Sequence, residues 1–172
     1  FNEKEVDELI LLDITATVEK RRPAFGFLSQ IASECFMPLG YGGGVQSLQD
    51  MRELFRLGVE KVVVNSSAVE NPSLVKEAAQ LFGSQSIVVS IDVKKNQFGE
   101  YEVWTHRARK RTDLDPVGHA VSMEAMGAGE IFLNSIVRDG TMEGYDLELV
   151  QKVTRALNIP LIACGGASSV QD

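Results

Sequence analysis

The sequence has few of the residues on which several classes of protein depend. Its 172 residues include only two cysteines, Cys35 and Cys164, which stand far apart in apolar surroundings. We therefore expect free thiols in a reducing cytoplasm rather than a disulfide framework. No apolar run approaches the ~20 residues needed to cross a bilayer, and no charged-then-apolar leader precedes a cleavage site. These absences favour a cytoplasmic protein that does not span or enter a membrane.

Positive charge and histidine are also scarce. Lysine and arginine number 17 against 24 acidic residues, which gives a formal net charge of −7. Because binding to a nucleic-acid backbone needs a basic face, we expect no nucleic-acid partner. The two histidines, His106 and His119, are isolated in the sequence, so we expect surface positions for them and no metal site. We expect no cofactor either.

Short β-branched runs alternate with helical patterns along the whole chain. Strands are expected at residues 9–12, 37–40, 61–64, 86–91, 130–133 and 160–163, with a hairpin insertion over 94–105. Continuous apolar strands are typical of a sheet that is covered on both faces. Strand–helix alternation implies parallel strands with right-handed crossovers. The fold class is therefore α/β, either a (β/α)₈ barrel of the TIM-barrel type or an open doubly wound sheet.

An internal repeat favours the barrel. At an offset of 122, residues 37–50 (MPLGYGGGVQSLQD) align without a gap with residues 159–172 (IPLIACGGASSVQD). Each repeat then holds four strand–helix units, and two repeats make about 244 residues, the usual size of such a barrel. We predict one partial TIM-barrel domain over residues 1–172, with about strands 2–7 of 8. The first and eighth strands are expected beyond the two ends of the chain.

Residues that follow the strands are the candidates for chemistry, because active sites of such barrels lie at the C-terminal ends of the strands. Asp92 follows the longest apolar run, where burial would raise its pKa and suit it to general acid or base catalysis. The alternative is a structural carboxylate that caps a loop or pairs with Lys94. Asp13 follows the first strand. It either orients substrate or hydrogen-bonds the threonine-containing loop after it.

Two glycine-rich turns stand at repeat-equivalent positions between a strand and a helix, at residues 42–44 and 165–166. Backbone amides in such turns can approach an anion, and a following helix N-terminus favours negative charge. Two copies predict two phosphate sites, and hence a long substrate with a phosphate at each end. Asn65 and Ser66 follow the next strand, where they either donate hydrogen bonds to the first phosphate or cap a helix. The polar loop at 138–141 (RDGT) has the character of a substrate loop.

Charged residues begin three strands at the opposite end of the predicted barrel. Glu8 and Glu130 are related by the offset of 122, and Lys61 begins the strand at 61–64. Charges that begin strands form either a solvated rim or, at repeat-related strands, a ring of ion pairs at the bottom of the barrel.

Several motifs together resemble the cyclase subunit of imidazole glycerol phosphate synthase, the HisF family. They run through the whole chain: DELILLDITA at 7–16, GGG at 42–44, KVVVN at 61–65, FGSQ at 82–85, SID at 90–92, RDGT at 138–141 and GYD at 144–146. The resemblance implies a (β/α)₈ enzyme of histidine biosynthesis that takes ammonia from a glutaminase partner. The ammonia cleaves and cyclises a bisphosphate substrate to give imidazole glycerol phosphate and an aminoimidazole carboxamide ribotide.

The resemblance also implies a role for individual residues. Asp92 matches one of two catalytic aspartates, and the other belongs to the strand expected before Phe1. Substrate or phosphate binding is implied for Asp13, Gly44, Asn65, Ser66, Asn134, Asp139, Gly140, Cys164 and Gly166. Glu8, Lys61 and Glu130 match three of four charges that gate the entry of ammonia. Glu60 matches the position where the family contacts its glutaminase.

The sequence departs from the family pattern at four places. Asn134 stands where threonine is usual, Cys164 where serine is usual and Val137 where aspartate is expected, and Arg107-Ala108 replaces a glycine-containing turn. Asn134 and Cys164 resemble paralogues associated with surface-polysaccharide genes, which implies delivery of ammonia to a nucleotide-linked sugar as an alternative function. A third alternative is a non-catalytic barrel fragment. With its outer strands missing, such a fragment is expected to self-associate and to lack turnover.

Overall fold

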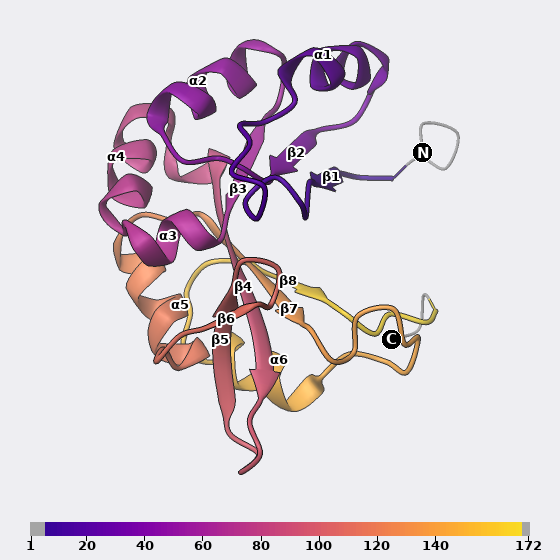
Figure 1. Cartoon of the computed structure of the whole chain (residues 1–172), viewed down its shortest axis with the longest axis vertical. Helices are drawn as coiled ribbons and strands as arrows, with labels where there is room; N and C mark the ends of the chain where they lie inside the picture. The colour runs from indigo at the N-terminus through magenta and orange to yellow at the C-terminus, as the bar shows by residue number, and fades with distance from the viewer. Residues whose placement is uncertain (1–5, 170–172) are drawn as a thin grey trace.

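The structure is a computed structural model, and it describes residues 6–169. Six parallel strands form its central sheet, in the order β1 (Leu9–Leu12), β2 (Leu39–Gly42), β3 (Lys61–Val64), β4 (Ile87–Lys95), β7 (Glu130–Ser135) and β8 (Leu161–Cys164). The sheet curls into part of a barrel whose open side lies between β1 and β8 (Figure 1). The predicted α/β fold, a (β/α)₈-type barrel represented by six of its strands, is confirmed.

Helices line the outer side of the curled sheet (Figure 1). They are α1 (Phe25–Glu34), α2 (Leu48–Arg56), α3 (Ser66–Glu70), α4 (Ser73–Phe82), α5 (Pro116–Ala125) and α6 (Leu147–Thr154), and a 3₁₀ turn, η2 (Ser84–Ser86), precedes β4. None of the helices in the described range is long and apolar enough to cross a membrane.

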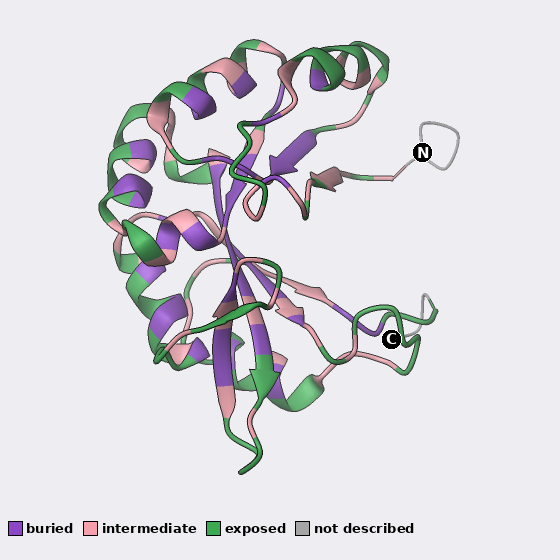
Figure 2. Cartoon of the chain, viewed as in Figure 1, coloured by how far each residue is buried: buried purple, intermediate pink, exposed green. Residues whose placement is uncertain are grey.

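The strands are apolar on both faces because each face is covered. Val62 and Val64 belong to the large cluster between sheet and helices, whereas Val63 points the other way. There it joins Val88 and Phe132 in a smaller cluster inside the curled sheet. Successive strand residues point to opposite faces, so a valine run fits a strand buried on both sides. Figure 2 shows the buried residues concentrated along the strands and on the inner sides of the helices.

The predicted hairpin insertion is present and longer than expected. β4 runs on past the barrel to Lys95 and pairs antiparallel with β5 (Tyr101–Thr105), which pairs in turn with the two-residue β6 (Lys110–Arg111). Gly99 occupies the first turn with a φ of 82°, which glycine adopts without strain. Asp92, expected at the end of a strand, therefore lies within one.

One pair of strands has bounds that are related by the offset of 122. β2 spans Leu39–Gly42 and β8 spans Leu161–Cys164, so both of their ends are shifted by this offset. The glycine pairs that follow, 43–44 and 165–166, all have positive φ. These coincidences support the half-barrel repeat, which stays a proposal.

The expected surface position of His119 is wrong. His119 is 5% exposed and lies on the same face of α5 as Pro116, Ala120 and Met123, all of them buried. Residues at this helical spacing share one side of a helix, and here that side packs on the sheet. Burial lowers the pKa of His119. His106, by contrast, is partly exposed.

Candidate functional site

A cavity of about 820 Å³ opens at the C-terminal ends of the parallel strands. Eight of the predicted substrate and catalytic residues line it: Asp13, Gly44, Asn65, Ser66, Asp92, Asn134, Asp139 and Cys164. They converge because the strand ends that carry them share one edge of the sheet. Gly140 and Gly166 are not among the lining residues. They lie in the two loops that follow β7 and β8.

Three of these residues form a row across adjacent strands. Asp92 on β4 is the register partner of Asn134 on β7, which is the partner of Cys164 on β8. The Asn134 side-chain amide donates a hydrogen bond to Asp92 Oδ1 at 3.0 Å. The Oδ1 atom of Asn134 is buried and has no partner within the described residues. The row therefore offers a carboxylate, an amide oxygen and a thiol to a ligand in the cavity.

Burial and neighbouring charge raise two pKa values in this row. Burial raises the pKa of the Asp92 carboxyl, Asp139 adds a like charge that raises it further, and the hydrogen bond from Asn134 opposes the shift. Burial also raises the pKa of the Cys164 thiol, and Asp139 and Asp92 act in the same direction. Cys164 is thus held as a thiol. A carboxyl with a raised pKa is suited to take up or release a proton near neutral pH.

One alternative was that Asp92 forms an ion pair with Lys94, but the structure shows no such pair between these two residues. The Lys94 ammonium lies 5.4 Å from the ring centroid of Trp104, on the hairpin. This leaves Asp92 with Asn134 as its hydrogen-bond partner in the described part of the chain.

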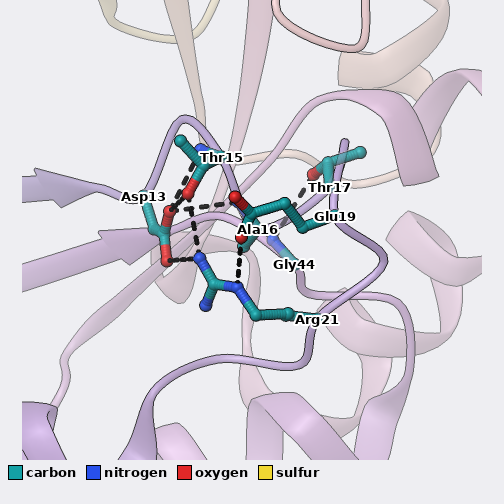
Figure 3. Close-up of polar contacts among 7 residues, drawn as sticks. All are labelled: Asp13, Thr15, Ala16, Thr17, Glu19, Arg21 and Gly44. Carbon is teal, nitrogen blue, oxygen red and sulfur yellow. Dashed lines mark hydrogen bonds and ion pairs between the residues drawn. The ribbon is translucent and has the colours of Figure 1, made fainter.

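Asp13 organises the loop after β1 (Figure 3). Its Oδ1 atom accepts three hydrogen bonds of 3.0 Å, from the amide and hydroxyl of Thr15 and from the amide of Ala16. Arg21 donates to the other oxygen at 3.3 Å. Burial raises the pKa of Asp13, but the hydrogen bonds and the charge of Arg21 outweigh it, so the net pKa is lowered. Loop organisation, one of the two expectations for Asp13, is what the structure shows.

The first glycine turn lies against this same loop. A Cβ on Gly43 would come within 2.4 Å of the Asp13 carbonyl oxygen, and one on Gly44 equally close to the carbonyl of Arg21. The Gly44 amide donates to the Thr17 hydroxyl at 3.4 Å (Figure 3). Only glycine permits this approach of two loops.

The second glycine turn is built in the same way. A Cβ on Gly165 would lie 2.5 Å from the Ser135 carbonyl, and one on Gly166 would lie 2.1 Å from the carbonyl of Gly144. The Gly144 amide donates to Gly166 at 2.7 Å. This hydrogen bond joins the loop after β7, which carries Gly140, to the turn after β8. The two loops are therefore held together.

The side chains of Asn65 and Ser66 form hydrogen bonds within the protein. The Asn65 amide donates to the Ser90 carbonyl at 3.1 Å, and the Ser66 hydroxyl donates to Asn65 Oδ1 at 3.3 Å. Ser66 Oγ also accepts the His106 amide at 3.1 Å. Asn65 precedes α3 but makes no side-chain cap hydrogen bond. The two residues thus link β3, β4 and the hairpin beside the cavity.

At the other end of the sheet, Lys61 joins the two acidic residues that begin β7 and precede β1. Its ammonium lies 2.8 Å from Glu8 Oε2 and 2.7 Å from Glu130 Oε1. Burial lowers the pKa of Lys61, but the two carboxylates outweigh this effect and raise it overall. The remaining oxygens, Glu8 Oε1 and Glu130 Oε2, are buried without a partner within the described residues. Lys61 thus bridges Glu8 and Glu130, and Glu60, next to Lys61 in the sequence, is exposed.

The cavity-lining residues that were not assigned to the site from the sequence include Lys20, His106 and Arg107. Each of these three has a positive φ, which no sequence pattern at these positions indicates. The replacement of a glycine-containing turn by Arg107-Ala108 was the available signal. Across residues 6–169, no group of His, Cys, Asp and Glu is arranged to hold a metal ion.

Known proteins are similar to this chain over its entire length. The profile of the family described as "Histidine biosynthesis protein" matches residues 1–172. The "Imidazole glycerol phosphate synthase subunit HisF" of Alkaliphilus metalliredigens is 45% identical over 172 residues, which are all of this chain and 68% of the relative. The "Putative imidazole glycerol phosphate synthase subunit hisF2" of Pseudomonas aeruginosa is 46% identical with the same coverage. The HisF subunit of Petrotoga mobilis is 44% identical and is covered to 69%. The chain belongs to the HisF family of imidazole glycerol phosphate synthase subunits.

Proposed function

We propose that this chain provides most of the cyclase subunit of an imidazole glycerol phosphate synthase, a cytoplasmic lyase of histidine biosynthesis. The observation that carries the proposal is the row formed by Asp92, Asn134 and Cys164 in a cavity that the first glycine turn also lines. A partly buried carboxyl of raised pKa lies in the same cavity as the first glycine turn, and the second glycine turn follows Cys164, which also lines that cavity. A bisphosphate substrate spanning both turns would place its reacting carbon and nitrogen atoms beside Asp92.

Asp92 would act as a general acid and base in this reaction. Ammonia adds to the substrate and loses a proton, and a leaving nitrogen gains one. A carboxyl whose pKa is raised toward neutrality can perform both transfers, and Asn134 fixes its orientation through the 3.0 Å hydrogen bond. Gly44, Asn65 and Ser66 would bind one phosphate. Gly140 and Gly166 would bind the other, Asp139 would contact the substrate at the mouth of the cavity, and Asp13 would hold the loop against the first glycine turn.

Ammonia would enter from the opposite end of the sheet. Glu8, Lys61 and Glu130 lie at the N-terminal ends of the strands, as an entry gate requires. A glutaminase subunit docked on this end, in contact with exposed Glu60, would supply the ammonia. Support for this partner comes from the family, whose members are named as subunits.

The test uses the complete gene product, the bisphosphate histidine intermediate and ammonium, with loss of the intermediate as the readout. Asp92→Asn should lower turnover by about 10²- to 10⁴-fold, the range that general acid–base groups contribute. Asp113→Asn, an exposed carboxylate outside the cavity, is the matched control and should leave turnover unchanged. Turnover that survives in Asp92→Asn would contradict the role of Asp92. A folded protein that never consumes the intermediate would contradict the substrate.

In a second candidate function, the protein also delivers ammonia, but to a different acceptor molecule. Asn134 and Cys164 line the cavity beside Asp92, so these two departures from the family pattern lie where a substrate would react. This placement favours delivery of ammonia to a nucleotide-linked sugar as the alternative. Consumption of such a sugar with ammonium, without consumption of the histidine intermediate, would support it.

We further propose that the polypeptide of these 172 residues alone lacks turnover. The family resemblance places a second catalytic aspartate on a strand before Phe1. A preparation of this polypeptide that is folded and consumes the intermediate would contradict the proposal.

A further inference from the structure

The turn between β5 and β6 is built from unfavourable backbone conformations. His106, Arg107 and Ala108 have φ values of 54°, 58° and 57°, all in the left-handed region. In L-residues this region brings Cβ too close to the neighbouring carbonyl, whereas glycine adopts it freely. Three successive non-glycine residues in this conformation persist only where the surroundings impose it, and such strain clusters at functional sites.

Contacts with α3 hold the turn in place. The His106 amide donates to Ser66 Oγ at 3.1 Å, and the His106 ring lies 3.5 Å from Glu70 Oε1. Lys110, at the other end of the turn, contacts the same Glu70 oxygen at 3.5 Å. The turn is thereby fixed beside Ser66, at the end of the cavity that Gly44 and Asn65 also line.

Arg107 is the residue that this arrangement presents to the cavity. It lines the cavity, is exposed, and has no recorded ion pair or hydrogen bond with any residue in the described range. Among the other basic groups nearby, Lys20 also lines the cavity, on the loop after β1, whereas Arg21 and Lys110 form ion pairs within the protein. Arg21 is bound to Asp13 and Glu19, and Lys110 is bound to Glu70. A guanidinium without an internal partner, on a fixed turn, is suited to bidentate binding of an anion.

We propose that Arg107 binds the phosphate monoester at the Gly44–Ser66 end of the cavity, and so helps to determine which anionic substrate the site accepts. The chemical class is a phosphate monoester because a glycine turn that carries Gly44 and a second loop that carries Arg107 both line this cavity beside Ser66. The phosphate at that end rests on the proposed function, and Arg107 adds a charged donor to it. The backbone strain then serves to hold this donor over the phosphate.

The probe is inorganic phosphate, titrated into the complete gene product and followed through the amide resonances of Gly44 and Ser66. Arg107→Ala keeps a Cβ in the strained turn and removes only the guanidinium, so it should raise the dissociation constant by about 10- to 100-fold. Arg109→Ala is the matched control. It lies in the same turn but does not line the cavity and lacks a positive φ, and it should change the constant less than about twofold.

A second variant separates binding from folding. Arg107→Gly should raise the melting temperature, because glycine relieves the left-handed strain, and should still weaken phosphate binding as much as Arg107→Ala does. A purely structural role for Arg107 would predict that stability and affinity fall together. Equal affinity in the wild type and Arg107→Ala, or no response of Gly44 to phosphate in the wild type, would overturn the proposal.

The titration is independent of turnover, so the two proposals can fail separately. Loss of phosphate binding in Arg107→Ala, in a protein that does not consume the histidine intermediate, would support Arg107 and contradict the proposed substrate. Turnover of that intermediate with the KM unchanged in Arg107→Ala would support the substrate and overturn the role of Arg107. A raised KM with little change in kcat is the expected result.

Discussion

At the scale of single residues, Asp92 combines burial with one compensating hydrogen bond. Its pKa is raised, so the folded state binds the proton more tightly than the unfolded chain does. The ionised carboxylate therefore destabilises the fold. This destabilisation is absent below the ordinary carboxyl pKa of 3.8 and grows as the pH rises through the folded pKa. A buried carboxylate that serves a function therefore lowers the free energy of unfolding.

We predict that Asp92→Asn raises the free energy of unfolding by about 1 kcal/mol at pH 7. The asparagine amide oxygen can still accept from Asn134, and no charge is buried. The gain should disappear at pH 3.5, where the wild-type carboxyl is protonated. Urea unfolding at the two pH values measures it, with Asp113→Asn as the control. A loss of stability at pH 7 would contradict the prediction.

His119 has the opposite pH dependence. Its pKa is lowered by burial, so the unfolded chain binds the proton more tightly than the folded state. The fold has its full stability above the ordinary histidine pKa of 6.5 and loses part of it as the pH falls through that pKa. We predict that wild type loses about 1 kcal/mol more than His119→Gln between pH 7.5 and pH 5.5. Parallel losses in thermal unfolding of the two proteins would show that His119 does not titrate on unfolding.

At the scale of elements, α2 has a complete N-terminal cap. The Ser47 hydroxyl accepts the Asp50 amide at 3.1 Å and donates to Asp50 Oδ2 at 2.8 Å. Asp50, 3% exposed, also accepts from the Gln46 amide and pairs with Arg22 at 2.7 Å. The cap therefore joins the start of α2 to the segment that leads into α1, and it positions the glycine turn just before it.

We predict that Ser47→Ala costs about 1 kcal/mol of unfolding free energy, as the loss of a serine cap usually does. Asp50→Ala should cost about 2–3 kcal/mol because it also leaves the Gln46 amide without its acceptor. Ser122→Ala, on the exposed side of α5, is the matched control and should stay within about 0.5 kcal/mol. Chemical denaturation measures all three variants. A cost for Ser47→Ala no greater than that of the control would contradict the role of the cap.

The sequence located the parallel strands because each is a short apolar run, but it did not fix their bounds. The strand expected at residues 37–40 lies at Leu39–Gly42, since glycines read as a turn also pair with β3. α3 was missed because five polar and small residues carry no helical period. β6 was missed because it has only two residues, both exposed.

At the scale of the molecule, the convergence of the candidate site followed from topology alone. Asp13, Asp92 and Cys164 were predicted at one edge because parallel strands end together. Their partners were not predictable in the same way. The hydrogen bond from Asn134 to Asp92 depends on strand register, and the strain at Arg107 depends on tertiary contacts with Ser66. The spacing of residues in the sequence indicates neither this hydrogen bond nor this strain.

The described sheet has two outer strands, β1 and β8, each paired on one side within residues 6–169. Unpaired strand edges favour association with other chains. We predict that the polypeptide of these 172 residues, prepared alone, self-associates. Light scattering across a range of concentrations measures this, with the complete gene product run in parallel. A stable monomer at every concentration would contradict the prediction.

The close approach of Gly43 to Asp13, and of Gly165 to Ser135, has a consequence for how this protein can change over time. Each close approach is to a backbone carbonyl, so we expect the span between the two turns to depend little on the side chains around the cavity. Substitutions at Arg107, Asn134 or Cys164 can then alter the chemistry of an accepted molecule without altering the length that fits. A scaffold of this kind fixes substrate size and leaves substrate identity free to diverge.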